Sequence, residues 1–149
     1  MNTESNFVEF QNAKRIWAIG SVHSNYESFN SIKDHLLSNF IGGDKLIILG
    51  NVIGLGDKAK DTISSILDLR LILMAKLCLQ PEEIVFLRGA QEEMFLKLMQ
   101  LQIAPNPEDI VKWVFDHGVD KTIQAYGFSK EEIQNIASQG TLSISKWTT

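Results

Sequence analysis

Cysteine, proline and clustered positive charge are all scarce in this chain, which has one cysteine and three prolines in 149 residues. The single cysteine, Cys78, forms no disulfide within the chain, and its apolar neighbours predict a small buried side chain. Fourteen basic residues are scattered among eighteen acidic ones, for a net charge of -4. Because binding a nucleic-acid backbone needs clustered positive charge, we expect no nucleic-acid partner.

Long apolar runs are also missing. The longest, residues 67–79, is interrupted by Asp68, Arg70 and Lys76, so it is unsuited to span a membrane. The first residues are polar and show no signal peptide, so we expect a soluble cytoplasmic protein without a membrane partner. Length and composition predict a single domain, residues 1–149, whose residues 1–12 form a flexible tail.

The N-terminal part of the chain contains three short apolar runs, each ending in glycine, at residues 15–20, 45–50 and 84–89. Runs of this length predict strands that are covered on both faces, as in parallel sheets. Helical spacing of apolar residues fills the intervals, over residues 26–40 and 59–77. This alternation predicts a parallel βαβαβ half with right-handed crossovers.

After Gly89 the pattern is helical throughout. Amphipathic spacing predicts helices over residues 91–101, 108–117, 121–126 and 130–138. The apolar side of the first, which carries Met94 and Leu98, is expected to be a core or partner face, and Ser129 is expected to cap the last. Residues 141–149 show no clear helical signature. The predicted fold class is therefore α/β, with an all-helical C-terminal segment.

The carboxyl ends of parallel strands meet at one rim of a sheet, where open α/β folds assemble their chemistry. The three loops expected at this rim follow Gly20, Gly50 and Gly89. Their polar and small side chains are the candidate site residues, namely Ser21, His23, Asn51, Arg88, Ala90, Gln91 and Glu92.

The order and spacing of these loops resemble the calcineurin-like metallophosphoesterases, in particular the bacterial branch of serine/threonine phosphoprotein phosphatases. The resemblance covers residues 15–126. In that family the loops usually read Gly-Asp-x-His-Gly, Gly-Asp-x-x-Asp-Arg-Gly and Gly-Asn-His-Glu, and they hold two metal ions whose bridging hydroxide attacks phosphorus in line. The resemblance implies the N-terminal half of a metallophosphoesterase-like sandwich.

Most positions that bind metal in the family carry other residues in this chain. Ser21 replaces a metal-binding aspartate, and Asn51 replaces the aspartate that bridges both metals. Ala90 stands for a ligand asparagine, and Gln91 for the histidine that assists the leaving group. Only His23 matches a ligand. The resemblance therefore implies a catalytically inactive pseudophosphatase, an interaction or regulatory module without a cofactor.

Several alternatives remain open on these residues. His23 could bind one Mn, Fe or Zn ion with Glu92 or Glu93 and a water. A working phosphoesterase with an unconventional metal site, which a partner chain could complete, is the rival hypothesis. Glu92 is equally placed in the first turn of a helix, whose dipole stabilises a carboxylate. A Ser21 nucleophile beside His23 is disfavoured because alternate residues of an extended loop point apart. Arg88 is the candidate for weak anion binding. An unrelated doubly wound domain would also show strands ending in glycine.

The family chain continues into a strand-rich second half with two further histidine ligands, whereas this sequence stops at residue 149. His117, the only later histidine, is expected at the end of a surface helix. Without a second layer the sheet would expose apolar surface and a strand edge, which favours a protein partner or a homo-oligomer. The expected binding surface is the rim around His23, Asn51 and Gln91, together with the exposed helical face.

Overall fold

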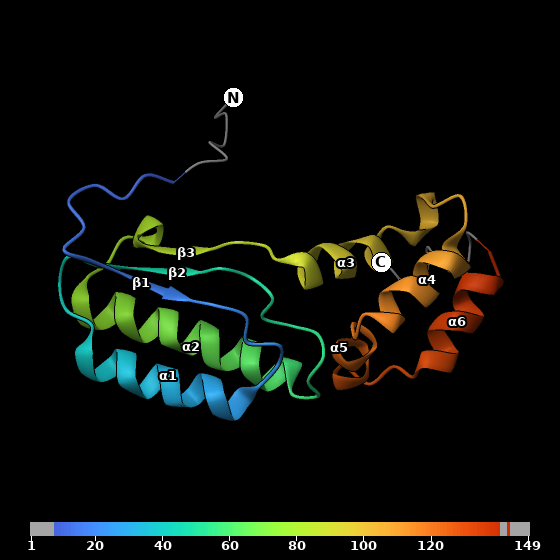
Figure 1. Cartoon of the computed structure of the whole chain (residues 1–149), viewed down its shortest axis with the longest axis horizontal. Coiled ribbons are helices and arrows are strands. Elements are labelled where there is room, and N and C mark those ends of the chain that lie inside the picture. The colour runs from blue at the N-terminus through green and yellow to red at the C-terminus, as the bar shows by residue number, and fades with distance from the viewer. Residues whose placement is uncertain (1–7, 141–142, 144–149) are drawn as a thin grey trace.

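The computed structural model describes residues 8–140 and residue 143. A parallel sheet with two helices forms one part of the molecule, and a group of helices follows it along the chain (Figure 1). The predicted α/β class is therefore confirmed. The expectations for the tails at residues 1–7, 141–142 and 144–149 lie outside the described residues, and residues 8–12 contain no helix or strand.

The sheet contains β1 (Arg15–Ile19), β2 (Asp44–Ile48) and β3 (Ile84–Phe86), paired in parallel in this order. Its crossovers are helices α1 (Tyr26–Asn39) and α2 (Ala59–Leu77), and the short 3-10 helix η1 (Pro81–Glu83) leads into β3. Trp17 lies opposite Leu46, which lies opposite Ile84. The predicted βαβαβ order is thus confirmed.

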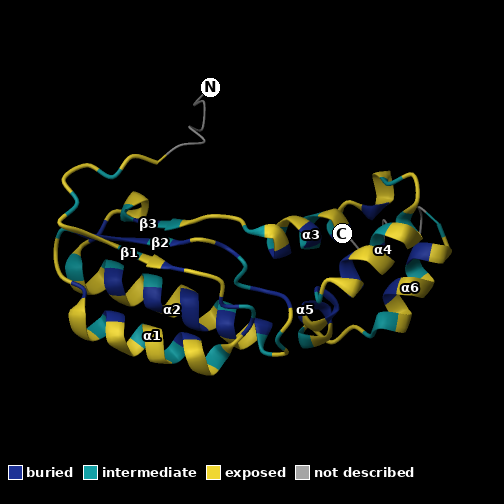
Figure 2. Cartoon of the chain, viewed as in Figure 1, coloured by how far each residue is buried: buried dark blue, intermediate teal, exposed yellow. Residues whose placement is uncertain are grey.

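Both crossover helices pack on the same face of the sheet, and buried residues fill the space between them (Figures 1 and 2). This core contains Phe29, Leu36, Leu46, Ile48, Leu69, Leu73 and Ile84. The opposite face is open along β1 and after β2, where Ile16 and Leu49 are each about half exposed. The expectation of strands covered on both faces was therefore wrong for β1 and β3, because right-handed crossovers that step in one direction leave their helices on one side. In the central strand β2, four of the five residues are buried.

The C-terminal segment is helical, as predicted, and builds a second core. It contains α3 (Ala90–Met99), the 3-10 helix η2 (Leu101–Ile103), α4 (Pro107–Asp116), α5 (Asp120–Ala125) and α6 (Lys130–Ser138). Met94, Leu98 and Leu101 are buried in this core, so the apolar side of α3 is a core face. Ser129 caps α6 by accepting a hydrogen bond from the Glu132 N–H at 3.1 Å.

No helix among the described residues is both long and apolar enough to cross a membrane.

Cys78 is exposed, so the prediction of a buried side chain was wrong. Helix α2 ends at Leu77, and Cys78 adopts the left-handed conformation (φ 52°) that often ends a helix. The turn there places Leu79, rather than Cys78, in the core.

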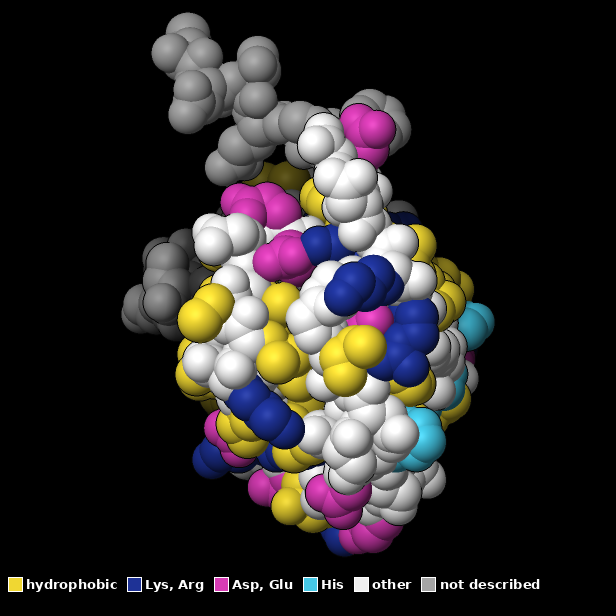
Figure 3. Space-filling view, turned by 90° about the vertical axis from the view of Figure 1, so that its left-hand side faces the viewer, with side chains coloured by type: hydrophobic (Ala, Val, Ile, Leu, Met, Phe, Trp, Pro, Cys, Tyr) yellow, Lys and Arg dark blue, Asp and Glu magenta, His cyan; other side chains and the backbone are white. Residues whose placement is uncertain are grey.

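A buried carboxylate joins the amino ends of β1 and β2. The side chain of Asp44 accepts hydrogen bonds from Arg15 Nε at 3.0 Å, Arg15 Nη2 at 2.6 Å, Trp17 Nε1 at 2.9 Å and the Ile41 N–H at 3.1 Å. The Arg15 guanidinium is the main cause that lowers the pKa of Asp44 from 3.8 to about 2. On this end of the molecule basic and acidic side chains lie next to one another (Figure 3).

Acid is expected to remove the contribution of Asp44 to stability. A pKa lowered by folding stabilises the protein above the unfolded value of 3.8 and loses that effect as the pH falls through about 2. We expect Asp44→Asn to lower the free energy of unfolding by about 2 kcal/mol near neutral pH, and the difference from the parent to shrink in acid. Urea unfolding across this pH range measures it. A difference that does not change with pH would contradict the prediction.

Candidate functional site at the rim of the sheet

The loops after β1 and β2 are joined at the carboxyl rim through their backbones. The N–H groups of Val22 and His23 both donate to the Asn51 carbonyl, at 3.0 and 2.9 Å. The N–H of Ser24 donates to the Val52 carbonyl at 2.8 Å. The predicted meeting of these two loops is therefore confirmed, and it depends on backbone groups rather than on the side chains of these residues.

Glu92 joins the second and third loops. Its Oε2 accepts from the N–H groups of Asn51 at 2.7 Å and Gly89 at 2.8 Å. Its Oε1 accepts from those of Val52 at 2.8 Å and Ile53 at 3.2 Å. Glu92 also lies in the first turn of α3, as the helix-dipole interpretation expects. Both carboxylate oxygens are thus engaged by four backbone donors, so Glu92 positions the loops.

Asn51 touches both of the other loops through its side chain. Its Nδ2 donates to Ser21 Oγ at 3.1 Å, and its Oδ1 accepts from the Gln91 N–H at 3.0 Å. Its backbone is left-handed (φ 51°), a conformation that asparagine adopts more readily than most residues. Asn51 therefore links all three loops as a hydrogen-bonding residue, at the position where the family resemblance places a metal bridge.

Gln91 points into the molecule, so its expected place on a binding surface was wrong. Its side chain is buried, with 7% of the residue exposed, and Nε2 donates to the His117 carbonyl at 3.0 Å. Its Oε1 is buried without a partner among the described residues. The adjacent Ala90 is exposed and has no donor or acceptor in its side chain. The third loop therefore connects the sheet with the helical segment.

The helical segment contributes contacts to the rim that the sequence analysis missed. The Gly54 N–H donates to Thr122 Oγ1 at 2.9 Å, and the Leu55 N–H donates to the Gly118 carbonyl at 3.0 Å. An added Cβ on Gly54 would lie 2.0 Å from Gln91 Oε1. The only sequence signal for this junction is the glycines themselves, since a glycine is often used where two backbones approach closely.

The loop that carries His23 is not extended, contrary to expectation. His23 and Ser24 have left-handed φ angles of 49° and 59°. His23 Nδ1 and the Ser24 hydroxyl are buried without a partner among the described residues. His117 is exposed at the end of α4, where its Nδ1 lies 2.7 Å from the Trp113 carbonyl oxygen, so the expectation of a helix-end surface histidine is confirmed.

The rim offers few groups that could bind a metal ion or an anion. Arg88 is exposed, and its Nε lies 3.3 Å from Glu93 Oε1. Within the described residues, no cluster of three or more His, Cys, Asp and Glu side chains could hold a metal ion. His23 supplies one imidazole, while Asn51 and Glu92 are engaged by other loops. This donor set does not fit two divalent ions, which need several ligands each.

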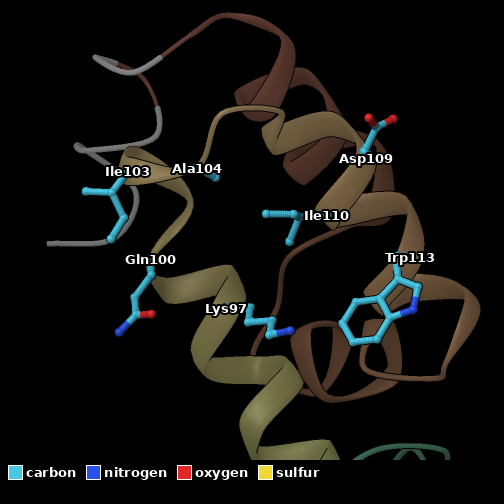
Figure 4. Close-up of a pocket in the computed structure, with 7 residues that line it drawn as sticks. All are labelled: Lys97, Gln100, Ile103, Ala104, Asp109, Ile110 and Trp113. Atoms are coloured by element: carbon cyan, nitrogen blue, oxygen red, sulfur yellow. The ribbon is translucent and has the colours of Figure 1, made fainter.

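A separate hollow lies in the helical segment, between α3, η2 and α4 (Figure 4). Its volume is about 390 Å³, and its lining is mostly apolar. Lys97 Nζ lies 4.9 Å from the ring centroid of Trp113, which is a cation–π contact. Among the described residues, Lys97 and Asp109 are the titratable side chains of the lining. The described lining therefore does not include the paired acid, base or nucleophile of a catalytic site.

No protein-family model, curated protein or solved structure matches this chain. The relationship to metallophosphoesterases therefore stays a prediction that is based on the order, spacing and residues of the three rim loops.

Proposed function

We propose that this chain is a metallophosphoesterase-like protein of the serine/threonine phosphatase kind that does not hydrolyse phosphate esters. In this proposal the α/β scaffold serves as an interaction or regulatory module that binds a protein partner or a second copy. The parallel βαβαβ order and the three glycine-started rim loops support the relationship. The open apolar face of the sheet supports a role in binding, because soluble monomers rarely expose large apolar patches.

The observation that carries the proposal is the hydrogen bonding of Glu92 and Asn51. Glu92 accepts from four backbone N–H groups, and the side chain of Asn51 bonds to Ser21 and to the Gln91 backbone. A metal ion or phosphate at this place would have to compete for atoms that already hold the loops together. If a ligand took over the oxygen atoms of Glu92 and Asn51, the partly buried N–H groups that they now accept from would lose their acceptors. Each unpaired donor would cost about 1–3 kcal/mol.

The second candidate function is an active phosphoesterase with one divalent ion, Mn, Fe or Zn, at His23. The observation in its favour is the buried Nδ1 of His23, which has no partner among the described residues. Because the nearby carboxylates are engaged, a partner chain would have to supply the remaining ligands. This candidate therefore requires a partner chain to complete its metal site, whereas the inactive scaffold has no metal site to complete.

Hydrolysis of p-nitrophenyl phosphate distinguishes the two candidates. With Mn²⁺, Fe²⁺ or Zn²⁺ added, we expect the purified chain to release no more nitrophenol than the buffer does. We also expect His23→Ala to behave as the parent does, since no turnover depends on this residue. Metal-dependent turnover that is lost in His23→Ala would contradict the proposal and favour the second candidate.

A further inference from the structure

Strand β3 is an edge of the sheet and presents unused backbone groups. It pairs with β2 on one side, and no other described strand pairs with it. The Leu87 N–H donates to the Ile48 carbonyl at 2.8 Å. The N–H and carbonyl of one strand residue point to the same side, and those of the next residue point to the other side, so the N–H and carbonyl of Phe86 point away from β2. Such an edge is a template for another extended chain.

An apolar cavity lies beside this edge, between β3 and α2. Its volume is about 260 Å³, and nearly all of its lining is apolar. Phe86 and Leu87 of the edge and Ile63, Ile66 and Leu67 of α2 contribute to it. Leu67 is 50% exposed, so the cavity opens to solvent next to the strand. The cavity can therefore receive an apolar side chain from a chain that lies along β3.

Two arginines flank the cavity and the edge. The guanidinium of Arg70 lies 6.0 Å from the ring centroid of Phe86, and its Nε is buried without a partner among the described residues. Arg88 follows the strand and forms an exposed ion pair with Glu93, of a kind that contributes little to stability. Guanidinium groups match carboxylates in charge and geometry. Glu92 also lines the cavity, but its carboxylate is engaged by four backbone N–H groups, and Glu93 pairs with Arg88. No described carboxylate forms an ion pair with Arg70, so this guanidinium favours an acidic occupant.

We propose that the edge of β3 binds an extended acidic segment of a partner protein. The segment pairs its backbone with Phe86, places an apolar side chain in the cavity, and brings carboxylates to Arg70 and Arg88. This inference rests on the proposed interaction module and names its partner chemistry. An extended peptide fits better than a small apolar acid, because the free peptide groups of Phe86 are matched by another backbone. Two β3 edges of identical chains would instead bring their arginines together.

Fluorescence anisotropy with labelled synthetic peptides tests the proposal. The probe alternates valine and threonine and carries an aspartate at each end, and its matched control carries lysine instead. We expect the aspartate peptide to bind and the lysine peptide to bind at least ~10-fold more weakly, a difference of about 1.4 kcal/mol. Methylation of alternate backbone nitrogens of the aspartate peptide should abolish binding, because it removes the donors that pair with β3.

Variants of α2 locate the binding surface. Leu67→Asn and Arg70→Gln should each weaken binding of the aspartate peptide, by roughly 10-fold. Leu71→Asn is the matched control, because Leu71 is 63% exposed on the same helix and does not line the cavity. Circular dichroism of the three variants should equal that of the parent. Equal binding of both peptides, or unchanged binding by Leu67→Asn, would overturn the proposal.

Three other results separate this inference from its alternatives and from the proposed function. If sedimentation shows a dimer that Leu67→Asn dissociates, a second copy occupies the edge and the partner segment is overturned. If the chain hydrolyses p-nitrophenyl phosphate yet still selects the aspartate peptide, the silent role fails and the edge assignment stands. If the chain is silent and selects neither peptide, only the edge assignment fails.

Discussion

Glu92→Gln is expected to lower the free energy of unfolding by about 3–5 kcal/mol, a large part of the stability of a small domain. The carboxylate accepts from four backbone N–H groups of two loops. Glutamine keeps the shape but offers one carbonyl oxygen, and its amide nitrogen would face N–H donors. At least two partly buried donors then lose their acceptor, and the charge that strengthens all four bonds is gone.

Urea unfolding of Glu92→Gln beside Glu93→Gln measures this effect. Glu93 is the adjacent residue of α3, and its ion pair with Arg88 is exposed. Its replacement should therefore change the free energy of unfolding by less than about 1 kcal/mol. If the two variants unfold at the same urea concentration, Glu92 does not hold the loops together and the account of the rim fails.

Gly50→Ala is expected to destabilise the protein by more than about 4 kcal/mol or to prevent folding. Gly50 has a φ of 91°, and an added Cβ would lie 2.2 Å from the Gly89 nitrogen and 2.7 Å from the Gly89 Cα. Both are backbone atoms, so no side-chain rotation relieves the contact. The loops after β2 and β3 would have to separate, which also breaks the bonds that Glu92 accepts.

Gly127→Ala is the matched control for this prediction. Gly127 has nearly the same conformation, φ 95°, but an added Cβ there meets no atom within 4 Å. The free energy of unfolding of this variant should fall only by the conformational strain of a left-handed alanine, about 1–2 kcal/mol. Thermal unfolding of both variants separates steric from conformational cost. Equal losses would show that the close approach of Gly50 and Gly89 carries no cost of its own.

Local pattern was sufficient to predict most of the elements. Apolar spacing placed α2 at residues 59–77, which are its observed bounds, and Ser129 was identified as the cap of α6. The sequence patterns predicted three strands and their parallel direction, which the structure confirms. These features depend on residues close together in the sequence, so periodicity and capping chemistry are visible without tertiary structure.

Features that depend on distant contacts were not predictable in the same way. Gln91 is polar and near a loop, which predicted a surface position, but its partner is the His117 carbonyl at the end of another helix. The contact of Gly54 with Thr122 spans 68 residues of sequence. Cys78 lies in an apolar run, yet a left-handed turn exposes it. Apolarity indicates that a segment is buried but does not specify which side chain a turn directs outward.

Isothermal titration of Mn²⁺ into the purified chain measures whether the rim binds a metal ion, which would need the atoms that Glu92 and Asn51 now use. We expect no heat beyond dilution, because the hydrogen bonds of the rim already engage these atoms. Tight, stoichiometric binding that is lost in His23→Ala would contradict the silent scaffold and make His23 the ligand of a working metal site.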